Sequence, residues 1–357
     1  MTTATATQID ESKLNSIIGQ AVSDFGGTAS AALVVIGDKL GLYKALRAAG
    51  PATPEDLAAR TGTSERYLRH WLLNQAASGY VNYSAATGKY SLSPEQAAVF
   101  ADDNSPAAMA GGFLLVTSIV KDEVKVAEAV RTGTGLNWGE HDPGLFSGTA
   151  RFFKPGYIGN IVQNWIPALE GAQARLEQGA TVADVGCGYG HSTMIMAEAY
   201  PASRVVGFDN HRPSIEAARK AAQEAGLAGR VTFEVASAQD FPGRDYDLIT
   251  YFDCLHDMGD PEGATRHAHQ VLKSGGAAML VEPMAGDSVE DNLNPIGRLF
   301  SAASVLVCTP HAIAEGGRPL GTIATDAELK AVFDGAGFKS FRRATETATN
   351  RVFEARP

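Results

Sequence analysis

One stretch decides the fold of this chain: Ala183-Asp184-Val185-Gly186-Cys187-Gly188-Tyr189-Gly190-His191-Ser192. Residues 181–185 are a short apolar run with β-branched side chains, which predicts a buried strand. Alternating glycines follow directly, and residues 192–200 then predict a helix that ends before Pro201. A strand, a glycine turn and a helix in this order offer bare backbone and free N–H groups to a ligand.

Two carboxylates flank the glycine turn. Asp184 lies two residues before Gly186, at the tip of its strand, where a carboxylate can meet a cation. Asp209 ends a second predicted strand, 204–208, and could accept hydrogen bonds from both hydroxyls of a ribose. A ligand with a carboxylate, an amino group and a ribose would satisfy the whole pattern. S-adenosylmethionine is such a ligand.

The glycine spacing is G-x-G-x-G, and His191 stands where a dinucleotide fingerprint has its third glycine. The pattern resembles motif I and the second acidic motif of class I S-adenosylmethionine-dependent methyltransferases. The alternatives are a purely structural turn and a nicotinamide site, and His191 disfavours the second. The resemblance extends over nearly the whole chain, but only residues 181–283 carry specific motifs.

The resemblance implies an α/β fold class: a Rossmann-like seven-stranded methyltransferase domain, preceded by a mainly α winged-helix-like domain. Alternation of strands and helices after residue 179 independently favours a parallel sheet covered on both faces. The resembled family implies a last strand that runs antiparallel. The predicted strands are 181–186, 204–209, 231–235, 246–252, 276–282, 338–343 and 351–355.

Ligands of an open parallel sheet bind outside the carboxyl ends of its strands, so the cofactor residues are sought there. Asp209 could instead be a helix N-cap. Ser237 stands where the resembled family often has an Asp for the adenine, so Ser237, Gln239, Asp240 or backbone groups would have to replace it. The predicted cofactor-binding residues are Asp184, Gly186, Gly188, Gly190, Asp209, Asn210, Ser237, Ala238, Gln239 and Phe252.

Methyl transfer is an in-line displacement at a sulfonium, so the protein must position the acceptor and exclude water. A general base is needed only for a hydroxyl or ammonium acceptor. His256, Glu282 and His141 are the catalytic candidates, with His311 a further one, and His256 could equally serve only to anchor the next helix.

Two apolar segments are candidates for the acceptor pocket. The aromatic side chains of residues 152–165 recur at helical spacing, and the resembled family folds this segment over the cofactor. Phe152 and Tyr157 are therefore pocket candidates, with core packing as the alternative. Phe300 lies in an apolar insertion, 292–310, that predicts either a lid or a dimer contact.

The N-terminal region predicts helices over 14–24, 31–40 and 43–49, a helix that begins at Pro54, another from Ser64, and a hairpin from 81–83 and 89–92. This is a winged-helix arrangement. Its basic and acidic side chains balance, which disfavours DNA binding. Residues 36–46 resemble the dimerisation domain of small-molecule methyltransferases.

Length and composition limit the number of domains and the kinds of partner that this chain can have. The length of 357 residues predicts about two domains, and a net charge of −10 disfavours nucleic acid and anionic lipid as partners. Cys187 and Cys254 are predicted to be small buried residues, and His267 and His269 face different ways on one helix, so no metal is expected. The first ten residues are Thr-rich without an apolar core, and residues 113–120 are too short to span a bilayer, so a cytoplasmic location is expected.

The sequence thus predicts a methyltransferase that uses S-adenosylmethionine, yields S-adenosylhomocysteine and acts on a small apolar or aromatic molecule by O-methylation, as a homodimer without membrane or nucleic-acid partners. The alternative is a winged-helix transcriptional regulator that senses the cofactor. The predicted segments are a dimerisation domain over 1–102, a helical connector over 103–178 and the methyltransferase domain over 179–357.

Overall fold

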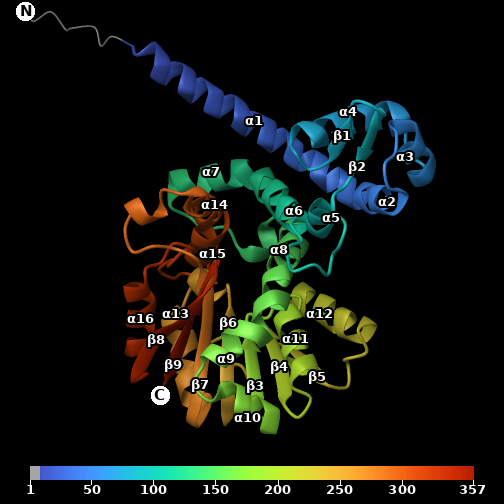
Figure 1. Cartoon of the computed structure of the whole chain (residues 1–357). Helices are drawn as coiled ribbons and strands as arrows, with labels where there is room; N and C mark the ends of the chain where they lie inside the picture. Colours follow the sequence, from blue (N-terminus) through green and yellow to red (C-terminus); the bar gives the residue numbers. More distant parts are fainter. Residues whose placement is uncertain (1–8) are drawn as a thin grey trace, which may run out of the picture. The chain divides into compact units, whose positions relative to one another are not determined.

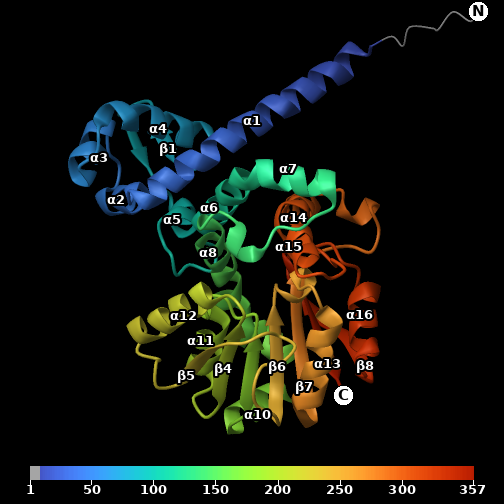
Figure 2. The same ribbon diagram turned by 180° about the vertical axis from the view of Figure 1, so that it is seen from behind.

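The computed structural model describes residues 9–357. The chain forms two compact units, one that ends at Thr117 and one that begins at Ser118. Both units can be followed along the chain in Figure 1 and from behind in Figure 2. The elements of the first unit are α1 (Glu11–Lys39), α2 (Leu42–Ala49), α3 (Pro54–Thr61), α4 (Glu65–Ala77), β1 (Asn82–Ser84), β2 (Lys89–Ser91), α5 (Pro94–Phe100) and most of α6 (Ala110–Ile119).

A single 29-residue helix, α1, replaces the two helices predicted over 14–24 and 31–40. Asp10 caps it by accepting hydrogen bonds from the amides of Ser12 and Lys13. The helix continues through Gly26 and Gly27, because glycine costs a helix only about 1 kcal/mol and does not end it without a competing cap. The prediction of two helices was therefore wrong.

The rest of the first unit agrees with the winged-helix prediction. Thr53 and Asp56 form the capping box that begins α3, and β1 pairs with β2 as an antiparallel hairpin. Gly37 allows α1 to approach α4 closely, since a Cβ there would lie 2.5 Å from the ring of Trp71. The core of this unit includes Leu42, Leu46, Leu57, Trp71 and Leu72.

The single helix predicted over 113–131 is broken in the structure. A 3₁₀ turn, η1 (Val120–Asp122), separates α6 from α7 (Glu123–Thr132). The break places Asp122 inside the second unit, where its carboxylate accepts a hydrogen bond from the Asp142 amide at 2.8 Å. Apolar periodicity alone could not show that this polar contact interrupts the helix.

The second unit is built on a seven-stranded sheet in the order β5-β4-β3-β6-β7-β9-β8. The first five strands along the chain pair in parallel, and β9 is antiparallel to both of its neighbours, as the resemblance implied. The strands are β3 (Thr181–Val185), β4 (Arg204–Asp209), β5 (Val231–Val235), β6 (Tyr246–Phe252), β7 (Leu272–Pro283), β8 (Ser340–Glu346) and β9 (Asn350–Arg356).

Helices cover both faces of this sheet, because the buried strands carry apolar side chains on each side. Val182 belongs to the core under one set of helices, and its neighbour Ala183 to the core under the other. The first set is η3 (Ile161–Trp165), α9 (Ile166–Ala168), α10 (Ala172–Gln178), α11 (His191–Ala199) and α12 (Arg212–Glu224), and the second set is α13 (Pro261–Val271) and α16 (Asp326–Gly335).

The remaining elements of this unit lie near the carboxyl ends of the strands or lead to them. The predicted apolar insertion is almost entirely helical, and Phe300 is buried within it. These elements are η2 (Trp138–Glu140), α8 (Gly144–Asn160), η4 (Leu255–Asp257), η5 (Glu290–Asn292), α14 (Pro295–Ala303), η6 (Ser304–Cys308) and α15 (Thr309–Ala314).

By length and composition, the helical run Pro295–Ala314 passes a test for a membrane span, and 39% of its apolar window is buried inside the protein. The bent pair α1 and α2 passes the same test if it is counted as one span. Buried helices of water-soluble domains also pass such a test, so it does not assign a membrane segment.

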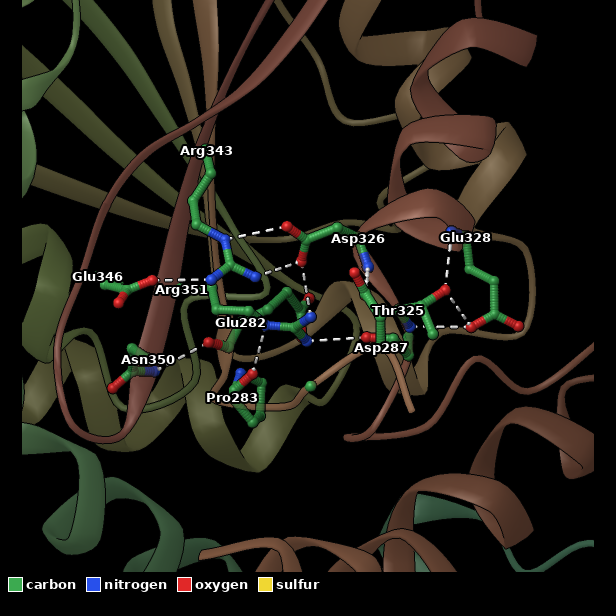
Figure 3. Close-up of polar contacts among 12 residues, drawn as sticks. Glu282, Pro283, Asp287, Thr325, Asp326, Glu328, Arg343, Glu346, Asn350 and Arg351 are labelled. Atoms are coloured by element: carbon green, nitrogen blue, oxygen red, sulfur yellow. Dashed lines mark hydrogen bonds and ion pairs between the residues drawn. The ribbon is translucent and has the colours of Figure 1, made fainter. Parts of the chain in front are cut away.

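A buried arginine fixes the end of the sheet (Figure 3). Arg351 on β9 is 1% exposed and donates to the carbonyls of Pro283 and Ala324 at 2.9 Å each. It also donates to Asp326, the first residue of α16, at 2.9 Å. Since Arg343 holds the same Asp326 carboxylate from the neighbouring strand, two cations anchor one helix start.

Replacement of Arg351 by Met should lower the free energy of unfolding by about 3 kcal/mol, because two buried carbonyls would be left unpaired at about 1–3 kcal/mol each. Urea denaturation measures this. Arg343→Met is the matched control, since its side chain is 33% exposed, and it should cost less than about 1 kcal/mol. Equal losses for the two variants would contradict the assignment of the buried network.

Candidate functional site

A pocket opens at the carboxyl ends of β3, β4, β5 and β6, the edge at which ligands of such sheets bind. All of its lining residues belong to the second unit. Of the residues predicted from the sequence, the following line it: Gly186, Gly188, Asp209, Asn210, Ala238, Gln239, Phe252, Tyr157 and His311. The structure places the others nearby or elsewhere, as described below.

The glycine turn takes the conformation that its sequence demands. Gly186, Gly188 and Gly190 have φ values of 72°, 52° and 74°, in the left-handed region that favours glycine. A Cβ on Gly186 would lie 2.6 Å from the Cys254 sulfur, and one on Gly190 would lie 2.4 Å from the Phe233 ring. Gly190 therefore serves the packing of α11 and does not itself line the pocket.

Asp209 lies on the pocket wall at the end of β4. Its Oδ2 accepts a hydrogen bond from the Gly188 amide at 2.9 Å, and its Oδ1 accepts one from the His211 amide at 2.8 Å. His211, not Asp209, occupies the N-cap position of α12, which removes the capping alternative. Burial raises the pKa of this carboxyl group.

Asp184 lies beneath the turn and does not line the pocket. Its carboxylate is fully buried and accepts hydrogen bonds from Ser192 at 2.7 Å and Thr193 at 2.6 Å, at the start of α11. Thr250 on β6 donates to its other oxygen at 2.9 Å. Burial raises the pKa of Asp184 to about 6 in spite of these bonds. The side chain is placed to join the turn to the sheet.

The end of β5 contributes Ala238 and Gln239 to the pocket. Ser237 does not line it, because its hydroxyl donates to Asp240 at 2.6 Å. Ser237 is therefore placed to order this loop, and among the predicted alternatives Ala238 and Gln239 are the ones that reach the pocket.

Asp253, directly after β6, is a pocket residue that the sequence analysis missed. It has a φ of 51°, which is uncommon for a residue with a side chain. Tyr157 and Asn350 donate hydrogen bonds to its two carboxylate oxygens at 3.0 and 2.7 Å. Burial, followed by the charge of Glu282, raises the pKa of Asp253 to about 8. Its place at a strand end was the available signal.

Aromatic side chains from η2 and α8 form a wall of the pocket. Tyr157 is on it as predicted, whereas Phe152 packs against Phe153 and does not line the pocket. Phe300 does not line it either. The sequence analysis missed Trp138, Phe146 and Phe153 on this wall, and Glu315 beside the predicted His311.

His256 and Glu282 form a buried pair, with His256 Nδ1 2.5 Å from Glu282 Oε2. Both side chains are nearly inaccessible, and Glu282 Oε1 has no hydrogen-bond partner. Burial alone would lower the pKa of His256, but the charge of Glu282 and the nearby Cys308 outweigh it and hold the pKa well above its ordinary value. The pair does not line the pocket itself, but its neighbour Asp257 does.

His141 forms a second buried pair, with its Nδ1 3.0 Å from Asp122 Oδ2. Lys125 and the Asp142 amide outweigh burial and keep the pKa of Asp122 low, while burial lowers the pKa of His141. A neutral imidazole in this pair would carry its proton on Nδ1, from which it would donate to the carboxylate. Its Nε2 is buried without a partner, and its ring lies 6.5 Å from that of the pocket residue Trp138.

The pocket is rich in carboxylates. Asp209, Asp253, Asp257 and Glu315 all line it, and among the described residues that line it none is Lys or Arg. A pyrophosphate would make ionisation of these carboxyl groups more costly, whereas a ligand that carries positive charge would favour it. The electrostatics therefore disfavour the nicotinamide alternative and favour a cationic ligand.

Fold and site together define the class of protein: a doubly wound α/β domain with a glycine turn and an acidic ligand pocket, as in methyltransferases. The sequence comparisons agree, since residues 176–327 match the family described as "Methyltransferase domain" and residues 28–101 match the "Rv2258c-like winged HTH domain". Residues 176–327 therefore form a methyltransferase domain, and residues 28–101 form a winged helix-turn-helix domain that precedes it.

One curated relative is the ubiquinone biosynthesis O-methyltransferase of Pseudomonas paraeruginosa. It is 33% identical over 132 residues, which are 36% of this chain and 53% of that protein. The match thus spans about half the length of this relative, and less of some others.

Solved structures resemble the chain over almost its full length. A putative O-methyltransferase from Nostoc punctiforme has a TM-score of 0.69 and 22% identity, over 98% of this chain and 99% of that one. Human N-acetylserotonin methyltransferase, solved with S-adenosylmethionine, has a TM-score of 0.72 and 17% identity, over 98% and 99%. At these identities the similarity establishes the fold.

Proposed function

We propose that the chain binds S-adenosylmethionine in this pocket and transfers its methyl group to a hydroxyl of a small apolar or aromatic molecule. The observation that carries the proposal is an acidic pocket at a bare-backbone turn. The sulfonium and the amino group of this cofactor are cations, so they suit a pocket lined by four carboxylates. The same pocket would hold the product S-adenosylhomocysteine.

Each part of the cofactor has a counterpart in the pocket. Asp209 has its carboxylate at the wall and would accept the ribose hydroxyls. Ala238 and Gln239 would contact the adenine, and Phe252 the methionine portion. The amino acid group would lie at the turn from Gly186 to Gly188, where backbone groups are accessible. We expected Asp184 to contact the amino group of the cofactor. Its hydrogen bonds to Ser192, Thr193 and Thr250 indicate that it would instead fix the conformation of the glycine turn.

Calorimetry with S-adenosylhomocysteine tests this proposal. The protein should bind about one equivalent, and Asp209→Ala should weaken binding about 10- to 100-fold, because a hydrogen bond to a charged group contributes about 1.5–3 kcal/mol. Asp334→Ala is the control, since Asp334 pairs with Lys330 on the surface of α16 and does not line the pocket. Absence of binding to the wild-type protein would refute the cofactor assignment, and equal affinity of the Asp209 variant would refute its role.

The acceptor would lie against the aromatic wall, which supplies apolar contact area and excludes water from the displacement. A hydroxyl must lose its proton as the methyl group arrives, so a base is required. His256 is the strongest candidate, because Glu282 orients its ring and the neighbouring Asp257 reaches the pocket. Glu282 would be a positioning residue. His141 is the second candidate, because its partnerless Nε2 could accept from an acceptor hydroxyl.

Replacement of His256 by Gln should lower kcat about 10²- to 10⁴-fold, the usual contribution of a general base. Transfer of a tritiated methyl group to a panel of phenols and hydroxylated aromatic acids measures this. His267→Gln is the control, since its imidazole does not line the pocket and instead contacts the ring and the carbonyl of Phe241, the latter at 2.8 Å. Unchanged turnover in His256→Gln would move the base to His141.

The dependence of the methyl-transfer rate on pH shows whether Glu282 orients His256 or only supports the fold. The raised pKa of His256 means that its base form appears only as the pH rises, so the rate should increase with pH through that value. Glu282→Gln removes the negative charge that raises the pKa, so the rising limb should move to lower pH while the maximum rate falls. A lower rate with an unmoved limb would contradict a positioning role for Glu282.

A homodimer formed through the first unit, within the predicted dimerisation domain, is also part of the proposal. The outer half of α1 carries Leu14, Ile17, Ile18, Val22 and Phe25 at helical spacing, and all five are exposed. A second copy of the same helix would cover this stripe.

The alternative of a DNA-binding regulator is less well supported. Arg69, in the helix that would contact DNA, is paired with Glu55 and Glu65, so its charge is already offset. A cytoplasmic location accords with the proposed methyl transfer and with the proposed dimer.

The double variant Ile17→Glu/Phe25→Glu should therefore be monomeric where the wild-type protein is dimeric, because it places charges in the buried stripe. Sedimentation equilibrium measures the mass. Val130→Glu, which changes a residue 70% exposed on α7, should leave the mass unchanged. A wild-type protein that sediments as a monomer would refute the dimer.

A further inference from the structure

Three unlike donor groups converge beside the pocket: the imidazole of His256, the carboxylate of Asp257 and the thiol of Cys308. Their ligand atoms all lie within 4.8 Å of one another. His256 and Cys308 are 3% and 5% exposed, and Asp257 is partly buried on the pocket wall. The methyl transfer proposed above assigns no task to Cys308, although its sulfur lies in this group.

The Nδ1 atom of His256 contacts a carboxylate, as in histidines that bind metals through Nε2. Glu282 engages Nδ1 at 2.5 Å, and Cys308 also forms a hydrogen bond with the imidazole, so a metal ion would replace that second contact. Histidines that bind metals almost always give their other ring nitrogen to a carboxylate or a carbonyl, which fixes the ring and makes it a better ligand. The His256–Glu282 pair thus supplies both the ligand and its support.

The surroundings favour a cation. Asp253, Asp257 and Glu282 bring three carboxyl groups close to one imidazole; Glu282 is buried, whereas Asp253 and Asp257 are partly buried on the pocket wall. The described residues that line the adjoining pocket include no Lys or Arg. A divalent ion would favour the deprotonated forms of the donors and would give them a common partner.

The chemistry of the donors selects the ion. A thiolate, an imidazole and a carboxylate are the ligands of zinc, whereas magnesium and calcium prefer oxygen alone. With bond lengths of about 2.0–2.3 Å, two ligands of a tetrahedral zinc lie about 3.5 Å apart. The three donor atoms already lie within 4.8 Å of one another, so tetrahedral coordination would require them to draw closer by about 1 Å at most.

We propose that His256, Asp257 and Cys308 form a binding site for one Zn²⁺ ion, supported by Glu282, with its remaining coordination position open to water. The ion and a proton would compete for the same lone pair of His256. If His256 is the base of the proposed methyl transfer, zinc inhibits that reaction reversibly; this consequence, unlike binding itself, rests on the proposed function.

The test uses the full chain without an affinity tag, stripped of metal by a chelator. Calorimetry with ZnCl₂ should show one equivalent bound, and affinity should fall as the pH falls because the ligands must lose protons. Co²⁺ should give a sulfur-to-metal charge-transfer band. Cys308→Ser should abolish that band and Asp257→Asn should weaken zinc binding, while Glu282→Gln should weaken it about 10- to 100-fold.

Cys187→Ala is the matched control, because it removes a buried thiol outside the group and should keep both the band and the affinity. Circular dichroism confirms that each variant is folded. Absence of stoichiometric zinc binding, or wild-type binding by Cys308→Ser, would overturn the proposal. Neither measurement uses the cofactor or an acceptor, so failure here leaves the methyltransferase proposal standing, and failure of S-adenosylhomocysteine binding leaves this one standing.

Discussion

The second unit depends on the hydrogen bonds that the buried carboxylate of Asp184 accepts. It lies at the end of β3 and is held by hydroxyls from the first turn of α11 and from β6. One side chain therefore ties a central strand, its neighbour and the helix that follows the glycine turn. A buried carboxylate is costly unless it is hydrogen-bonded, so these elements must stay in register for the charge to remain satisfied. The ligand turn takes its shape from this requirement.

The same constraint explains why the pocket favours a cation. Asp209 and Asp253 stand at the carboxyl ends of β4 and β6, where burial raises the pKa of each although backbone or side-chain donors hydrogen-bond to both. Ionisation of these two groups is therefore costly in the free protein. A ligand with positive charge lowers the cost of ionisation, and an anionic dinucleotide would raise it. The preference for a cationic ligand at the carboxyl ends of the strands thus follows from buried carboxyl groups without a neighbouring cation as much as from the shape of the glycine turn.

Most of the fold could be predicted from the sequence, because strands, glycines and caps are local signals. The ends of the strands at 209 and 252 and the start of a helix at Pro54 could be predicted in this way. Tertiary contacts decided the rest. Asp122 breaks a helix through a partner 20 residues away, and α1 continues through two glycines. The pocket wall was missed at Trp138 and Phe153 for the same reason, since no spacing rule links a loop to the edge of a sheet.

The donor group at His256 shows most clearly what sequence spacing cannot reveal. Metal motifs are recognised when their ligands lie a few residues apart, and on that ground no metal site was expected. Cys308 is far from His256 along the chain, and only the return of η6 to the carboxyl ends of the strands brings its sulfur close. In the zinc site that we propose, the imidazole has competing tasks, because its Nε2 can take a proton or a metal ion but not both. Glu282 would strengthen either bond, so the group bound at His256 would depend on pH and on the zinc concentration.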